Sequence, residues 1–145
     1  MSSNTLTAHA PANDLPGRDF LALVGRVLVA FLFVPAGFGK IGGFAGVVGY
    51  IGAVGLPLPQ LGAVIAIAVE LGLGLLLLVG YKTRIVSIVL AVFTVATAVF
   101  FHNFWAMPAD KAYINQLMFL KNIAIAGGLL AIAALGAGRF SIDKK

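Results

Sequence analysis

The stretch of sequence that decides the fold is residues 61–81, LGAVIAIAVELGLGLLLLVGY, in which Glu70 is the single charged residue. A helix needs about 20 apolar residues to cross the hydrocarbon core of a bilayer, which is about 30 Å thick. This stretch therefore predicts a membrane-spanning helix. An ionised carboxylate at membrane depth is costly unless it is paired, so Glu70 needs a partner or a function.

Three more apolar stretches of similar length accompany it, at residues 20–39, 85–101 and 117–138. Apolar residues make up 61% of the 145-residue chain, charged residues make up 10%, and the mean hydropathy is +1.05. A soluble domain this small could not bury so much apolar surface. We therefore predict an all-α integral membrane protein, a four-helix bundle whose transmembrane domain covers residues 19–139.

The two ends of the chain are polar. Residues 1–18 carry no basic region followed by an apolar one, so they do not resemble a cleavable signal peptide. We expect them to form a disordered cytoplasmic tail, and residues 140–145 to form a second cytoplasmic tail.

The segment between the first and second spans, residues 41–56, is apolar but rich in glycine. Its glycines recur at every third position, so on a helix of about 3.6 residues per turn they do not share one face. Each costs about 1 kcal/mol relative to alanine in a helix. The segment is predicted to be a short interfacial or re-entrant helix, and it could lie over the mouth of the bundle as a lid.

The basic residues indicate the orientation in the membrane. With four crossings, one side holds six of them, Arg18, Lys82, Arg84, Arg139, Lys144 and Lys145, and the other holds Lys40 and Lys111. Cytoplasmic loops carry the excess of Lys and Arg, so both termini are predicted to be cytoplasmic. The basic residues behind the net charge of +5 therefore act as orientation signals at the ends of the spans. We expect the lipid bilayer, not nucleic acid, as the partner.

Two charged residues, Arg26 and Glu70, are expected inside the bundle. Arg26 lies about 10 Å and Glu70 about 15 Å from the cytoplasmic face at about 1.5 Å per residue, so they are predicted to pair. A guanidinium binds a carboxylate through two hydrogen bonds and stays charged in a dry site. Lys121, near the start of the fourth span, is the alternative partner of Glu70. Such charges could have a purely structural role and hold the helices in one arrangement. Alternatively, they could form a proton-accepting or anion-binding cavity.

A second polar cluster is expected at the outer end of the bundle, formed by Lys40, His102, Trp105, Lys121 and Asn122. It could be an interfacial belt of aromatic and polar residues. It could also hold a ring-shaped substrate such as a quinone, with Trp105 as a flat surface and His102 or Lys121 binding its carbonyls. No metal site is expected, because the chain has no cysteine and its other histidine, His9, lies in the N-terminal tail.

These residues occur in an order and spacing that resemble the DoxX family of small bacterial membrane proteins, over about residues 26–143. The matching segments are residues 36–44 (AGFGKIGGF), 55–59 (GLPLP), 69–72 (VELG), 83–84 (TR), 101–105 (FHNFW), 119–122 (FLKN) and 138–143 (GRFSID). The resemblance implies a four-helix, multi-pass protein of the bacterial inner membrane. Some members of the family are linked to quinone-coupled oxidation of sulfur compounds or to oxidative-stress complexes.

Three functions remain open on the sequence alone. The first is a membrane subunit or accessory of a quinone-linked or oxidative-stress redox system, with a redox enzyme as partner. The second is a structural or assembly protein, and the third is a small proton-coupled transporter that uses Arg26, Glu70 and Lys121. No cofactor other than a quinone is indicated. Four short helices leave little room for a transport pathway unless the protein forms a homo-oligomer.

Overall fold

The computed structural model describes residues 17–144. The elements are α1 (Arg18–Gly42), α2 (Phe44–Ala53), α3 (Pro59–Ile67), the π-helix η1 (Ala68–Leu73), α4 (Gly74–Val79), α5 (Thr83–Phe101), the 3-10 helix η2 (Phe104–Ala106) and α6 (Ala109–Leu135). No strand occurs in this part of the chain, so the prediction of an all-α fold is confirmed. The tail expected over residues 1–18 lies outside the described residues except for its last two.

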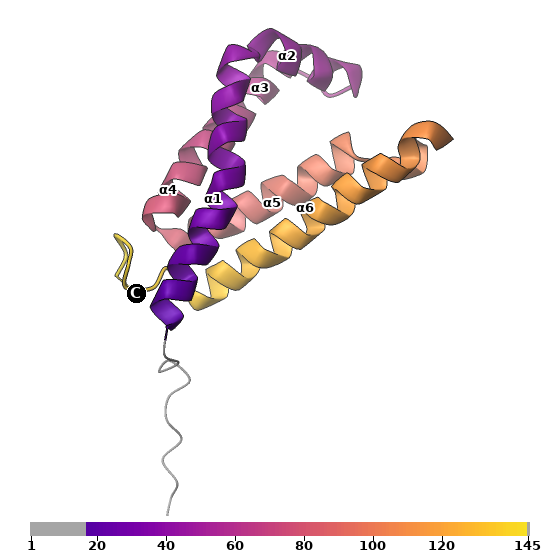
Figure 1. Cartoon of the computed structure of the whole chain (residues 1–145). Helices are drawn as coiled ribbons and strands as arrows, with labels where there is room; N and C mark the ends of the chain where they lie inside the picture. Colours follow the sequence, from indigo (N-terminus) through magenta and orange to yellow (C-terminus); the bar gives the residue numbers. More distant parts are fainter. Residues whose placement is uncertain (1–16, 145) are drawn as a thin grey trace, which may run out of the picture.

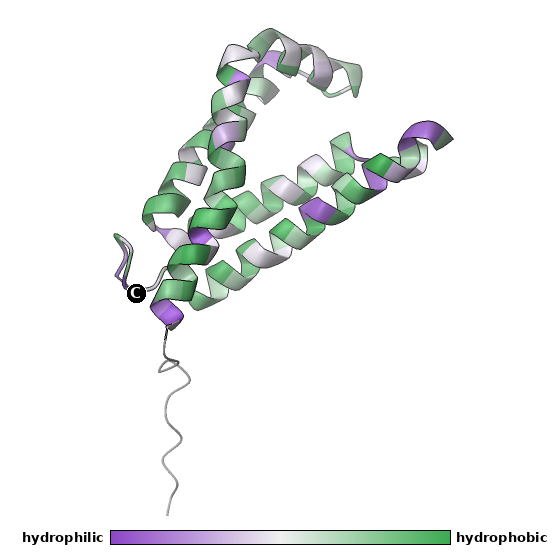
Figure 2. Ribbon diagram, in the orientation of Figure 1, coloured by the Kyte–Doolittle hydropathy of each residue, from purple (hydrophilic) through white to green (hydrophobic). Residues whose placement is uncertain are grey.

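Four helical segments are long and apolar enough to cross a membrane, as predicted. They are Arg18–Gly42, Pro59–Val79, Thr83–Ala106 and Ala109–Leu135, and the second consists of α3, η1 and α4 in succession. Figure 2 shows apolar residues along most of the length of these segments. Many large apolar side chains point outward, with Phe31 78% exposed, as expected for helices that face lipid.

The four segments form two helical hairpins. In the first, α1 packs along α3, η1 and α4, and in the second α5 packs along α6. Figure 1 shows the hairpins close together at the end near the C-terminus and diverging toward the other end. The core where they meet contains Phe33 and Leu77 of the first hairpin and Val86, Leu90 and Leu129 of the second.

Helix α2 lies at the open end of the molecule and turns sideways from the top of α1 (Figure 1). Its 10 residues span only about 15 Å, half the thickness of the hydrocarbon core, so α2 does not add a crossing. The chain leaves it through Gly55, whose positive φ of 79° suits glycine, and Leu58 adopts a left-handed conformation just before Pro59. Whether α2 is interfacial or re-entrant stays a prediction.

The end of the chain after α6 folds back over the link between α4 and α5. Ile142 N–H donates to Val79 O and Asp143 N–H to Gly80 O, at 3.1 and 2.9 Å. The Asp143 carboxylate accepts the N–H groups of Lys82 and Thr83, at 2.9 and 2.8 Å, at the start of α5. The described residues of the expected C-terminal tail, 140–144, are therefore part of the fold.

Basic side chains satisfy carbonyl groups at the end of α6 in the same region. Arg18 donates to Leu135 O at 2.8 Å, and Arg84 donates to Ala133 O and Ala134 O at 3.1 and 3.0 Å. The last carbonyls of a helix have no hydrogen-bond donor within the helix, and these arginines supply one. They also gather the start of α1, the α4–α5 link and the end of α6 at one end, as four crossings require.

Candidate functional site

The candidate site includes an ion pair within the first hairpin. Lys40 Nζ is 2.6 Å from Glu70 Oε2, and the two side chains are 28% and 12% exposed. Lys40 belongs to the last turn of α1 and Glu70 to η1. Gly37 makes this contact possible, because a Cβ added there would lie 2.5 Å from Leu71 N, so the two backbones nearly touch.

Glu70 lies on a π-helix, which the sequence pattern did not predict. The segment Ala68–Leu73 interrupts an otherwise α-helical rod. π-Helical turns are rare, and they frequently occur at functional sites. This irregular turn is therefore a second reason, beside its charge, to regard Glu70 as part of a site.

The predicted pairing of Arg26 with Glu70 is wrong. Arg26 is fully buried and donates to three main-chain carbonyls, Leu77 O at 3.2 Å, Leu78 O at 2.9 Å and Phe140 O. The first two belong to the C-terminal end of α4, where carbonyls lack the usual N–H donor four residues ahead, although Leu77 O also accepts the N–H of Gly80 at 3.1 Å. Glu70 lies seven residues before Leu77, about 10 Å away along the helix, and it pairs with Lys40 instead. Arg26 therefore holds α1, α4 and the C-terminal segment together.

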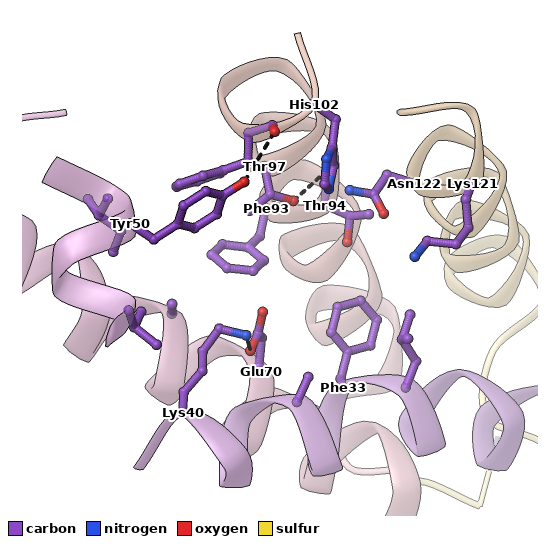
Figure 3. Close-up of a pocket in the computed structure, with 16 residues that line it drawn as sticks. Phe33, Lys40, Tyr50, Glu70, Phe93, Thr94, Thr97, His102, Lys121 and Asn122 are labelled. Carbon is purple, nitrogen blue, oxygen red and sulfur yellow. Dashed lines mark hydrogen bonds and ion pairs between the residues drawn. The ribbon is translucent and has the colours of Figure 1, made fainter. Parts of the chain in front are cut away.

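A pocket of about 320 Å³ lies between the two hairpins, and the Lys40–Glu70 pair forms part of its wall (Figure 3). Its polar lining consists of Lys40, Tyr50, Glu70, Thr94, Thr97, His102, Lys121 and Asn122, and its apolar lining of Leu32, Phe33, Ala36, Val47, Ile51, Ala66, Phe93 and Phe101. This volume is within the range of small-molecule sites. The structure thus brings four of the five residues of the predicted outer cluster to one pocket.

His102, Lys121 and Asn122 line the side of the pocket formed by the second hairpin. His102 Nδ1 lies 3.3 Å from Asn115 Oδ1, and Lys121 Nζ lies 3.4 Å from Met118 Sδ. In Figure 3 Asn122 and Lys121 face the space across from the Lys40–Glu70 pair. Within residues 17–144, Lys121 has no carboxylate partner.

Trp105, the fifth residue of the predicted cluster, does not line the pocket. Its ring packs edge-on against Phe104 of the same η2 turn and Phe119 of α6, at centroid distances of 5.2 and 5.7 Å. Trp105 is 60% exposed. This arrangement matches the alternative interpretation of the segment as an interfacial aromatic group.

Tyr50 and Phe93 line the pocket and were missed in the sequence. The Tyr50 ring lies 5.2 Å from that of Phe101, and its hydroxyl lies 3.4 Å from Phe101 O. Helix α2 thereby reaches from the first hairpin to the end of α5, and its role as a lid stays a prediction. Tyr50 carries the only polar side chain among residues 41–56. This feature of the sequence could have marked it as a pocket residue. Nothing distinguished Phe93 from the other apolar residues of its span.

Across residues 17–144, no group of three or more His, Cys, Asp or Glu side chains could hold a metal ion.

The DoxX family model matches residues 21–103, more than half of the chain. The chain belongs to the DoxX family. Among the relatives of this DoxX protein are two from Escherichia coli strain K12. Inner membrane protein YqjF is 43% identical over 126 residues, which cover 87% of this chain and 92% of YqjF. Inner membrane protein YphA is 37% identical over 128 residues, which cover 88% of this chain and 91% of YphA.

A more distant relative is ER-derived vesicles protein ERV29 of Saccharomyces cerevisiae, 27% identical over 128 residues that cover 34% of its length. No solved structure matches this DoxX protein at a significant level. The family, the inner-membrane relatives and the four long apolar segments identify it as a multi-pass protein of the bacterial inner membrane. The family match includes Lys40, Glu70 and His102, whereas Lys121 and Asn122 lie beyond it.

Proposed function

We propose that this DoxX protein binds a small lipophilic molecule with a polar head in the pocket between its hairpins. It does so as the membrane subunit or accessory of a redox system, and a quinone is the candidate ligand. The observation that carries the proposal is the pocket itself, where Lys40, Glu70, His102, Lys121 and Asn122 face one space of about 320 Å³.

The composition of the pocket supports this class of ligand. Ligand sites are usually apolar with a few polar groups that orient the ligand, and here Phe33 and Phe93 offer flat apolar surface beside the polar side chains. Lys121 and His102 can donate hydrogen bonds to carbonyl oxygens such as those of a quinone. The chain contains no cysteine, and we propose that a redox partner provides the electron-transfer chemistry.

The orientation of the protein is also proposed, with both termini in the cytoplasm. The structure gathers the start of α1, the α4–α5 link and the C-terminal segment at one end. That end carries most of the basic residues, which favours the cytoplasmic side. Reporter fusions after Lys145 and within residues 103–113 test this, and a periplasmic signal from the C-terminal fusion contradicts it.

The binding proposal is tested by purifying the full chain in a mild detergent and identifying the co-purifying lipids, quinones and proteins by mass spectrometry. We expect a lipophilic molecule in near-stoichiometric amount, and a quinone together with a redox enzyme would support the redox assignment. A folded protein that carries no lipophilic ligand would favour a structural or assembly role instead.

A further inference from the structure

The pocket contains more positive than negative charge. Lys40 and Glu70 form an ion pair, so their charges cancel. Lys121 adds a second ammonium group to the same lining. The side chains around the space therefore carry one net positive charge.

No carboxylate among residues 17–144 is placed to balance Lys121. Asp19 pairs with Arg139, and Asp143 accepts the N–H groups at the start of α5. Asp110 lies in the first turn of α6, about three turns before Lys121.

The present contact of Lys121 does not compensate its charge. Its ammonium group lies beside Met118 Sδ, and a thioether is a weak acceptor. Lys121 is an exposed residue of a segment long and apolar enough to cross the membrane, so its charge faces lipid or the open side of the pocket, where an uncompensated charge is costly. An anion in the pocket would remove that cost and bring the net charge of the site to zero.

We infer that the head of the ligand is an oxyanion, a carboxylate or phosphate carried on an apolar chain. The inference rests on the proposed function, a lipophilic ligand with a polar head in this pocket, and it names an oxyanion in place of the quinone as that head. The Lys121 ammonium and the Asn122 amide donate to the oxyanion, and hydrogen bonds to charged groups are roughly twice as strong as neutral ones. Phe33 and Phe93 contact the apolar part, which continues through the open side of the pocket between the hairpins.

The test compares three probes with a ten-carbon chain, decanoate, decanol and a decyl-substituted benzoquinone, on the purified full chain in detergent. Native mass spectrometry and competition against labelled decanoate give the affinities. We expect decanoate to bind at least about tenfold more tightly than decanol, since one charge-assisted contact is worth about that factor.

Variants of two lysines on α6 make the test specific. Lys121→Met should bring the affinity for decanoate down to that for decanol, whereas Lys121→Arg keeps the charge and should preserve the preference. Lys111→Met is the matched control, because Lys111 lies on the same helix and does not line the pocket. Size-exclusion chromatography and circular dichroism show that each variant is folded before it is compared.

Each outcome decides between the two proposals. Equal binding of decanoate and decanol, binding of the benzoquinone alone, or an unchanged preference in Lys121→Met overturns the oxyanion inference and leaves the proposed function standing. Failure of all three probes to bind overturns both. Displacement of decanoate by a short-chain phosphatidic acid but not by the diacylglycerol with the same chains identifies a lipid phosphate as the source. No displacement by either excludes a lipid phosphate and leaves a carboxylate as the head group.

Discussion

Lys40 Nζ lies 2.6 Å from Glu70 Oε2, and this ion pair joins the last turn of α1 to the π-helix η1. It places a positive and a negative charge on one wall of the pocket, at the end where the hairpins diverge. The pair therefore has a structural role within the first hairpin and shapes the polarity of the site.

Breaking the Lys40–Glu70 pair should destabilise the protein. Glu70→Gln leaves the ammonium group unpaired, with an expected loss of about 3 kcal/mol in the free energy of unfolding. The double variant Lys40→Met with Glu70→Leu should lose less, because no charge is left without a partner. Denaturant unfolding in detergent measures both, with Lys111→Met as control. Wild-type stability of Glu70→Gln would contradict the role assigned to the pair.

Arg26 should matter more for stability than any exposed arginine. Arg26→Met removes the donor to Leu77 O, Leu78 O and Phe140 O, and we expect a loss of at least about 3 kcal/mol. Arg26→Lys should recover little, since a compact ammonium lacks the planar fork of a guanidinium. Thermal unfolding in detergent compares these with Arg139→Met, whose side chain is 87% exposed and which should change stability little. An equal effect of Arg26→Met and Arg139→Met would refute this account.

The close approach of α1 and η1 at Gly37 can be tested by comparing Gly37→Ala with Gly39→Ala. In Gly37→Ala the added methyl group would lie 2.5 Å from Leu71 N, and overpacking of this kind costs about 1–3 kcal/mol. At Gly39 nothing lies within 4 Å, so Gly39→Ala should be neutral or stabilise the helix by up to about 1 kcal/mol. Unfolding measurements that show the same effect for both would mean that the helices are not in contact at Gly37.

The C-terminal segment should stabilise the start of α5 through Asp143. Its carboxylate accepts the N–H groups of Lys82 and Thr83, so Asp143→Ala should cost about 1 kcal/mol, the typical effect of losing an N-terminal cap. Hydrogen exchange should show faster exchange of these two amides in the variant. Unchanged exchange at both positions would show that the segment does not hold the helix end.

Much of the fold was accessible from the sequence because apolar length fixes membrane spans directly. Residues 61–81 and their three counterparts predicted the four crossings, and the short α2 fell within the glycine-rich segment. The irregular backbone was not accessible, since neither the π-helix around Glu70 nor the folding back of residues 136–144 leaves a periodic signal.

The Arg26 error has the same origin. Counting residues gave similar depths for Arg26 and Glu70, but it did not show that Phe140 O and the end of α4 would supply acceptors for the guanidinium. Because Arg26 donates to these carbonyls, it does not pair with Glu70, and Glu70 forms its ion pair with Lys40. The outer cluster was predicted more closely, because Lys40, His102 and Lys121 were each placed near the same end of their spans.

The most direct test of the account is to fill the pocket and measure what stays bound. Ala36 lines the pocket, whereas Ala124 is an exposed residue of α6 outside it, so Ala36→Phe and Ala124→Phe form a matched pair. Mass spectrometry of the lipid-soluble molecules retained by each folded, purified protein gives the amount bound. We expect a near-stoichiometric lipophile in the wild type and in Ala124→Phe, and its loss in Ala36→Phe. The same bound amount in all three proteins would contradict it.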